Sequence, residues 1–180
     1  MLMKELLGKG VVGDIDMIIG GKGCPPLSGW LVDPNMGGGI LLYLGVHLTD
    51  QVLWVVESEV EKVYAEINFH PRFKVDQTAT YTLRFKNGIL ATLNCSMCAG
   101  QSFDFLEIIG SEGYIRSEWR GSKVTVYSRK VKEYFNTTTI QLQEEQMRLY
   151  ELELQEFTEA ILENREPAIT GEDARNVLEI

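Results

Sequence analysis

The stretch TATYTLRFKNGILATLNCSM, residues 78–97, decides the fold of this 180-residue chain. In residues 78–85 apolar side chains alternate with threonines and one arginine, and in residues 89–97 the alternation resumes. A period of two is typical of a strand that buries one face. We therefore predict two strands, joined across Lys86-Asn87-Gly88.

The register of this hairpin follows from keeping the apolar side chains on one face. A two-residue Asn-Gly turn would mix the faces, because a slip of one residue turns every side chain over. A three-residue loop with Gly88 in the left-handed conformation pairs Leu83 with Ala91 and Tyr81 with Leu93. We predict this loop, and with it an antiparallel sheet that has one buried face.

The alternation continues on both sides of the hairpin, and helical patterns follow it. Further strands are predicted at 14–19, 59–70, 103–109, 113–118, 123–128 and 132–137. A helix is predicted at 143–164 from an apolar stripe made up of Met147, Tyr150, Leu154, Phe157 and Ile161. Thr170 begins a final helix, with acidic residues in its first turn. The predicted fold is α+β, an open-faced, largely antiparallel sheet with these helices packed on one face.

The N-terminal GKGVVG, residues 8–13, matches the G-x-G-x-x-G pattern of dinucleotide-binding proteins. That pattern holds a nucleotide only when a strand enters the glycine turn and a helix leaves it. Here a helix-forming run at 2–7 precedes the glycines and an alternating run at 14–19 follows them. We therefore predict no Rossmann domain in this chain, with Gly8 or Gly10 as the cap of a short entry helix.

Composition narrows the class of protein. The net charge is -9, and residues 144–180 hold 11 acidic against 3 basic residues, which is typical of solvated helix faces. No basic stripe is present, so we expect no nucleic-acid partner. No stretch approaches the ~18 apolar residues of a membrane span and no signal peptide is recognisable, so we expect a cytoplasmic protein with no membrane partner. Cys95 and Cys98 fall on opposite faces of a strand, so we expect no metal site.

Chemistry-bearing residues concentrate in WLVDPNMGGGILLYLGVHLTDQVLW, residues 30–54. Three glycines in a row, Gly37-Gly38-Gly39, are costly in a helix, so we predict a backbone that a ligand or another chain approaches closely. An apolar helix follows from Ile40. Its spacing places four polar-tipped side chains on one face: Tyr43, His47, Asp50 and Trp54.

Two interpretations of His47 stay open from the spacing. The row could line a pocket, with the imidazole of His47 transferring a proton and the hydroxyl of Tyr43 positioning a substrate. Alternatively, His47 is buried and hydrogen-bonded to Asp50, with Tyr43 in the core. The other histidine, His70, precedes a proline at a strand end, where we expect it at the surface.

The segment resembles the C-terminal domain of the Gfo/Idh/MocA oxidoreductases, the family of glucose–fructose oxidoreductase and inositol dehydrogenase. The residues that carry the resemblance are Trp30, Asp33, Pro34, Gly37, Gly38, Gly39, Leu41, Gly45, His47 and Asp50. Later signatures of the family are similar to residues 85–88, 108–113 and 157–173. Two positions depart from the pattern, because Leu31 replaces an arginine and Tyr43 replaces an aspartate four residues before the histidine.

The resemblance implies a site and a cofactor. It implies that His47 is an acid/base beside a sugar or polyol hydroxyl. The other residues it places near the substrate are Trp30, Asp33, Gly38, Gly39, Tyr43 and Asp50. It assigns NAD or NADP to an N-terminal Rossmann domain, which also carries the family's Glu-Lys-Pro motif. The Glu61-Lys62 pair here continues with Val63 and is not that motif.

From the resemblance we expect residues 1–180 to form one C-terminal substrate-binding and oligomerisation domain, with residues 1–13 as its entry helix and linker. The complete protein would be an NAD(P)-dependent dehydrogenase, and this chain alone would bind no cofactor and be inactive. The expected partners are the N-terminal Rossmann domain and further copies, in a homodimer or tetramer joined through the open sheet face. The alternative is a non-enzymatic sugar-binding or dimerisation module of the same family, which Tyr43 favours.

Overall fold

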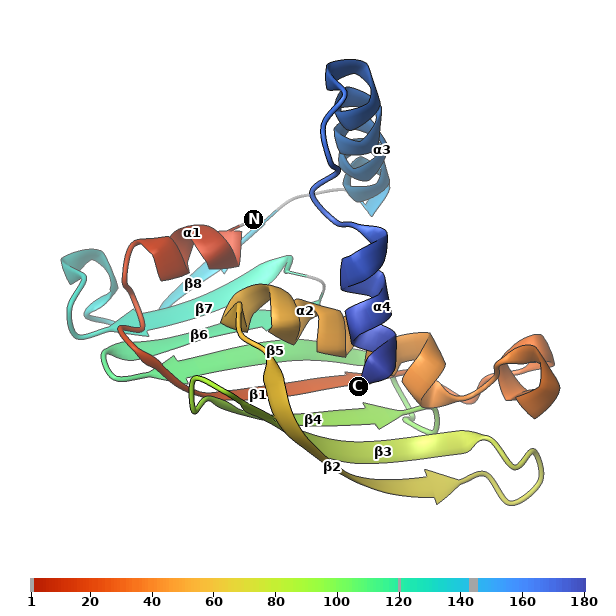
Figure 1. Ribbon diagram of the computed structural model, residues 1–180. Helices are drawn as coiled ribbons and strands as arrows, with labels where there is room; N and C mark the ends of the chain where they lie inside the picture. The colour runs from red at the N-terminus through yellow and green to blue at the C-terminus, as the bar shows by residue number, and fades with distance from the viewer. Residues whose placement is uncertain (1, 120, 143–145) are drawn as a thin grey trace.

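The computed structural model describes residues 2–119, 121–142 and 146–180, without the side chains of 146–149. Its centre is one eight-stranded sheet with the strand order β2-β3-β4-β1-β5-β6-β7-β8 (Figure 1). The strands are β1 (Ile15–Gly23), β2 (Val60–Phe69), β3 (Asp76–Phe85), β4 (Leu90–Ser96), β5 (Phe103–Gly110), β6 (Gly113–Glu118), β7 (Lys123–Ser128) and β8 (Thr138–Gln141). Neighbouring strands pair antiparallel except β1 and β4, which run parallel. The predicted sheet is confirmed, with one parallel pair at its middle.

The register of the β3–β4 hairpin is also confirmed. Leu83 lies opposite Ala91 and Tyr81 opposite Leu93. The Gly88 N–H donates to the carbonyl of Phe85 over 2.9 Å, and Gly88 has a φ of +92°. A glycine accepts this backbone conformation without the strain that a Cβ atom would cause, which is why the loop takes three residues.

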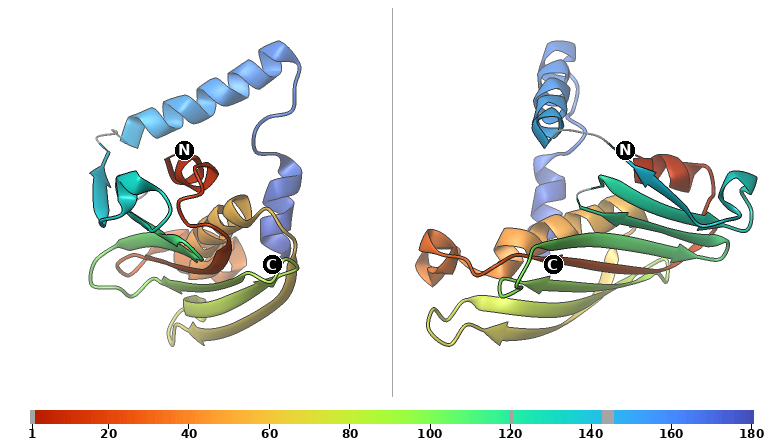
Figure 2. Two further views of the ribbon diagram at one scale, coloured as in Figure 1. Left: turned by 90° about the vertical axis from the view of Figure 1, so that its left-hand side faces the viewer. Right: turned by 180° about the vertical axis from the view of Figure 1, so that it is seen from behind.

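Helices cover one face of the sheet and leave the other open. The helices are α1 (Leu2–Gly8), α2 (Val46–Val56), α3 (Gln146–Glu163) and α4 (Gly171–Glu179). Figures 1 and 2 show α1, α2 and α4 on the same side of the sheet. The core between the two layers includes the fully buried side chains of Leu6, Ile18, Leu48, Leu93 and Ile108. The predicted α+β class with helices on one face is therefore confirmed.

The N-terminal glycines end a helix, as predicted. The N–H groups of Gly10 and Val11 donate to the carbonyls of Leu7 (2.8 Å) and Leu6 (3.3 Å), and Gly10 has a φ of +71°. This is the hydrogen-bond pattern of a Schellman cap. The chain then enters β1, so the order is helix, glycine turn, strand. In the described residues GKGVVG is not a dinucleotide-binding turn.

The prediction that the helix at 143–164 covers the sheet is wrong. Residues 143–145 and the side chain of Met147 lie outside the described part of the structure, and α3 ends at Glu163. Figure 2 shows α3 standing away from the sheet. Its other stripe residues are more than half exposed: Tyr150 (56%), Leu154 (67%), Phe157 (55%) and Ile161 (64%). The cover comes from α1 and α2 as well as α4, and the stripe of α3 stays free.

The predicted strand at 132–137 is also wrong. Residues Lys132–Tyr134 form a short 3-10 turn, and the strand, β8, comes later. The Ser128 hydroxyl accepts hydrogen bonds from the N–H groups of Lys130 (3.2 Å) and Val131 (3.1 Å), which turns the chain. Tyr134 is 4% exposed and anchors the turn in the core. The buried Tyr134, with the polar Glu133 before it, gives an alternation of apolar and polar residues similar to that of a strand.

The 23-residue run Pro34–Val56 is long and apolar enough, by length and composition, to cross a membrane, with a mean hydropathy of 1.5 over an 18-residue window. The expectation that no stretch approaches the length and apolar composition of a membrane-spanning helix is therefore wrong. In this structure the run ends in α2, whose Leu48 and Val52 are fully buried in the core between helices and sheet. Packing inside the domain accounts for its apolar composition.

Candidate functional site

The segment from Trp30 to Gly39 folds back on its own backbone. Two 3-10 turns, η1 (Gly29–Val32) and η2 (Pro34–Met36), leave the Trp30 side chain 55% exposed. The Asp33 carboxylate accepts a hydrogen bond from the Asn35 N–H over 2.9 Å and so caps η2. The N–H of Gly39 donates to the carbonyl of Leu31 over 2.9 Å. Asp33 therefore has a structural role in this loop.

The close approach predicted at the three glycines is made by the chain itself. A Cβ atom on Gly38 would lie 2.7 Å from the carbonyl oxygen of Leu31. A Cβ atom on Gly39 would lie 2.0 Å from Oδ1 of Asp76, and Gly39 has a φ of +128°. Gly37 has open space around it but a φ of +76°. Packing and backbone conformation therefore account for all three glycines.

A π-helical turn, η3 (Leu41–Gly45), opens the helix that carries the candidate acid/base. The carboxylate of Asp76 accepts from the N–H of Leu41 over 2.7 Å and holds the start of the turn. Beneath its end the Tyr81 hydroxyl donates to the carbonyl of Gly45 (3.3 Å) and lies 3.1 Å from the Thr49 hydroxyl. A π turn breaks the regular helical ladder, and such turns are frequent at functional sites. Sequence reasoning misses Asp76, and it reads Tyr81 only as a core residue of its strand.

Of the two interpretations, the one in which His47 is buried and hydrogen-bonded to Asp50 is wrong. His47 is exposed, Tyr43 is 36% exposed, and no hydrogen bond joins His47 to Asp50 among the described residues. The imidazole is thus accessible from outside the core. His70, expected at the surface, is half-buried. Its Nδ1 accepts from the N–H groups of Arg72 (3.1 Å) and Phe73 (3.2 Å), which is a structural role.

Asp50 and Trp54 lie further along the same helix, on the side that faces α4 and α1. Partial burial raises the pKa of Asp50; the charge of His47 opposes this rise and the charge of Asp173 adds to it. The Lys4 ammonium lies 4.5 Å from the centre of the Trp54 ring and pairs with Glu57. Burial is therefore the main influence on the Asp50 carboxyl, while a cation–π contact with Lys4 holds Trp54.

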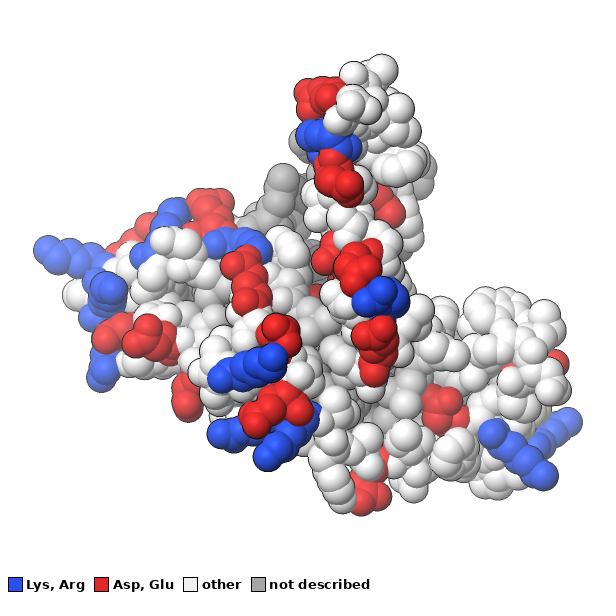
Figure 3. Space-filling model, viewed as in Figure 1, with Lys and Arg blue, Asp and Glu red and all other residues white. Residues whose placement is uncertain are grey.

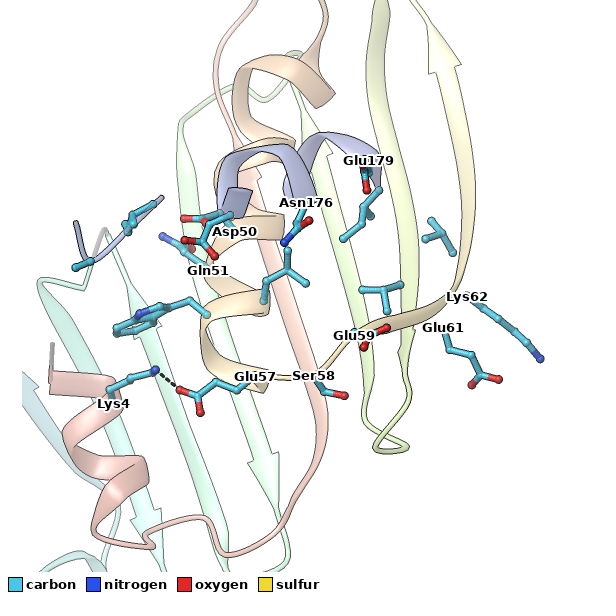
Figure 4. A pocket seen from close by; sticks show the side chains of 18 residues that line it. Lys4, Asp50, Gln51, Glu57, Ser58, Glu59, Glu61, Lys62, Asn176 and Glu179 are labelled. Atoms are coloured by element: carbon cyan, nitrogen blue, oxygen red, sulfur yellow. Dashed lines mark hydrogen bonds and ion pairs between the residues drawn. The ribbon is translucent and has the colours of Figure 1, made fainter. Parts of the chain in front are cut away.

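These two residues line a groove of ≈ 1040 Å³ between α2, α4 and the start of β2 (Figure 4). Its wall carries six carboxylates, Asp50, Glu57, Glu59, Glu61, Asp173 and Glu179. Figure 3 shows further acidic side chains along α3 and α4, with a few basic ones between them. Trp30, Asp33, Tyr43 and His47 are not among the lining residues. Of the predicted site residues, Asp50 and Trp54 therefore line this acidic groove, whereas Trp30, Asp33, Tyr43 and His47 lie outside it.

Buried polar groups lie under the helix layer as well. Lys22 on β1 is 7% exposed and pairs with the Asp104 carboxylate over 2.7 Å. Burial raises the pKa of the nearby Cys95 thiol to about 11. The described residues contain no group of three His, Cys, Asp or Glu side chains placed to hold a metal ion.

Comparison with known proteins gives consistent matches. The family model described as the GFO/IDH/MocA C-terminal domain matches residues 1–116. Myo-inositol 2-dehydrogenase of Thermotoga maritima is 25% identical over 184 residues, covering 98% of this chain and 54% of that protein. The 1,5-anhydro-D-fructose reductase of Ensifer adhaerens is 26% identical, covering 83% of this chain and 45% of that protein. The chain thus spans about half the length of the curated relatives it matches.

Solved structures share the fold. A levoglucosan dehydrogenase in complex with NADH and L-sorbose superposes with a TM-score of 0.86, at 19% identity, over 99% of this chain and 57% of that one. At this identity the likeness establishes the fold alone.

Proposed function

The chain belongs to the GFO/IDH/MocA family, as a C-terminal domain of it, and from this premise we propose that it is the substrate-binding half of an NAD(P)-dependent oxidoreductase. The substrate is a sugar or polyol, oxidised or reduced at one CH–OH carbon. His47 is the proton-transfer group. The observation that carries the proposal is the exposed imidazole of His47. It lies just after a π turn whose ends are hydrogen-bonded to Asp76 and Tyr81.

The names of the relatives support the substrate class. A myo-inositol dehydrogenase, an anhydrofructose reductase and a dehydrogenase solved with L-sorbose all concern polyhydroxylated rings or chains. Such molecules present several hydroxyls at once, and partly exposed polar side chains can hydrogen-bond to them. The hydroxyl of Tyr43 and the imidazole of His47 are both exposed and only four residues apart, so they are suited to neighbouring hydroxyls of one substrate.

The chemistry assigned to this chain is proton transfer and orientation. Oxidation of an alcohol to a ketone releases a proton from the hydroxyl oxygen, and neutral His47 accepts it; in reduction, protonated His47 returns it. The nicotinamide supplies the hydride chemistry when bound. The described residues do not fit that cofactor, because the one G-x-G-x-x-G run lies between a helix and a strand. We assign the cofactor to an N-terminal Rossmann domain outside this chain.

The free stripe of α3 is proposed as the contact for that domain. Its four exposed apolar side chains form an apolar face of a kind that single domains seldom leave uncovered. The family has its cofactor domain in the other half of the protein, and this chain accounts for 54% of the inositol dehydrogenase. A second domain packed on this stripe would remove these side chains from water, which stabilises the contact.

A pair of histidine variants tests the proposal, in a polypeptide that joins this chain to its dinucleotide-binding half. His47→Asn removes the proton acceptor, so kcat with NAD⁺ and a polyol is expected to fall ~10²–10⁴-fold. His70→Asn is the matched control, since asparagine keeps an acceptor for the turn that His70 closes. Activity that survives His47→Asn within a factor of a few contradicts the proposed role.

A second candidate is a non-enzymatic sugar-binding or dimerisation module. Tyr43 favours it, because the family pattern has an aspartate at that position. The sequence upstream discriminates the two. A strand followed by G-x-G-x-x-G, together with a Glu-Lys-Pro motif, supports the enzyme, and their absence supports the module.

A further inference from the structure

Two cysteines far apart in the sequence lie side by side where β1 and β4 end. The N–H of Cys24 donates to the carbonyl of Ser96 over 2.9 Å, and the N–H of Ala99 donates to the carbonyl of Cys24 over 3.1 Å. Two residues, Met97 and Cys98, therefore face Cys24, which is the arrangement of a β-bulge. Met97 is 2% exposed and lies in the core, whereas Cys98 is exposed.

The backbone spacing suits a covalent link. Neighbouring strands lie about 4.8 Å apart, and disulfides join Cα atoms about 4.4–6.8 Å apart. The two thiols also lie close enough to interact electrostatically, because burial raises the pKa of Cys24 and the charge of Cys98 raises it further. Cys24 is half-buried and Cys98 exposed, so an oxidant reaches Cys98 first.

We propose that Cys24 and Cys98 form a reversible disulfide site that ties the segment carrying Trp30 and Asp33 to the end of β4. Hydrogen peroxide oxidises the Cys98 thiolate to a sulfenic acid and is reduced to hydroxide. The Cys24 thiol then attacks the sulfenic sulfur, an S–S bond forms, and the oxygen leaves as water. A dithiol reductant reverses the bond by thiol exchange, taking up the two electrons.

The third cysteine provides an internal control. Cys95 is 1% exposed, and burial raises the pKa of its thiol to about 11, so little thiolate is present at neutral pH. Its side chain lies in the core, as does that of Tyr81. It is expected to stay reduced under mild oxidation.

The test uses the reduced chain, treated with dilute hydrogen peroxide and then unfolded in an alkylating reagent. Trypsin leaves Cys24 in peptide 23–62, and both Cys95 and Cys98 in peptide 87–116. Because a linked pair of these peptides does not distinguish Cys95 from Cys98, the variants Cys95→Ala and Cys98→Ser identify which cysteine is bonded to Cys24. The wild type and Cys95→Ala are expected to lose two alkylatable thiols and to yield linked peptides. Cys98→Ser is expected to lose none. Cys98 is exposed, so this variant is expected to fold.

Either of two results overturns the proposal. In one, Cys98 gains two or three oxygens in the wild type with no linked peptide. In the other, Cys98→Ser still forms an intramolecular bond. A second readout is amide hydrogen exchange of residues 25–36, which is expected to slow on oxidation and to recover with a dithiol. Unchanged exchange in a protein shown to be linked contradicts the tether.

Discussion

At the scale of single residues, Gly39 is a position with almost no space for a side chain. It adopts a φ of +128°, and a Cβ atom there would lie 2.0 Å from a carboxylate oxygen of Asp76. Gly39→Ala is expected to destabilise the fold by about 2–4 kcal/mol, through backbone strain and loss of the Asp76 bond to the π turn. In a thermal scan the Tm is expected to fall by roughly 5–10 °C.

Gly37 is the matched control for Gly39. It has a φ of +76° but nothing within 4 Å of its Cβ direction. Gly37→Ala therefore carries only the left-handed backbone cost, about 1–2 kcal/mol. An equal decrease in Tm for Gly39→Ala and Gly37→Ala would show that the contact with Asp76 does not determine the cost of a side chain at Gly39.

Asp50 gives a pH-dependent prediction. Its pKa is raised in the folded state, mainly by burial, so the folded state favours the protonated form. The contribution of protonated Asp50 to the free energy of unfolding is therefore fully present below the pKa of an unfolded aspartate, about 3.9. It declines as the pH rises through the pKa of Asp50 in the folded state. Asp50→Asn is expected to have a higher Tm than the wild type at pH 7, by up to about 3 °C, and the difference is expected to vanish in acid.

Asp16→Asn, at an exposed carboxylate on β1, is the control and is expected to leave the Tm unchanged. A lower Tm for Asp50→Asn than for the wild type at pH 7 would contradict the raised pKa.

The residues of the candidate site could be predicted only in part. His47 and the three glycines stand out from the sequence because imidazole and consecutive glycines are unusual on an apolar helix. Asp76 and Tyr81 lie 35 and 36 residues beyond Leu41 and Gly45, to which they hydrogen-bond, and only the folded sheet brings them to the π turn. Contacts between distant segments leave no local pattern, so no reading of periodicity finds them.

At the scale of elements, α4 depends on the residue that caps its N-terminus, Thr170. The Thr170 hydroxyl accepts from the N–H of Asp173 over 3.2 Å, and the Asp173 carboxylate accepts from the N–H of Thr170 over 2.8 Å. Thr170→Ala breaks this capping box and is expected to cost about 1 kcal/mol, or 2–4 °C in Tm. Thr158→Ala, inside α3, is the control and is expected to be neutral or stabilising.

Most helices and strands could be predicted from the hydrophobic period and from capping residues. The exceptions depend on contacts that the local pattern does not contain. The hairpin, the capping box and the end of α1 are local, so the sequence specifies them directly. The stripe of α3 shows that an apolar helix face needs a partner, but nothing in the stripe says which surface provides it. The turn at 132–134 depends on a serine hydroxyl and a buried tyrosine, which mimic a strand's alternation.

At the scale of the whole molecule, the open face of the sheet is expected to join two copies. The core side chains of β1 and β5 to β7 alternate with half-buried apolar ones on the opposite face: Met17, Ile19, Phe105, Ile109, Tyr114 and Tyr127. Light scattering is expected to give a dimer or tetramer. Ile109→Glu places a charge on that face and is expected to give a monomer, whereas Ile169→Glu, at a side chain 62% exposed in the groove, is not.

A strict monomer at high concentration, or a dimer that resists Ile109→Glu, would contradict association through the sheet face.

The central claim, that His47 lies beside the substrate and the cofactor site lies elsewhere, is tested most directly by NMR of the two histidines in this chain. The imidazole resonances are recorded while myo-inositol is added at millimolar concentrations, and then NADH. The expected result is that the polyol shifts the His47 signals and leaves His70 in place, and that NADH shifts neither. A His47 signal that no polyol moves, or a micromolar response to NADH, would contradict the claim.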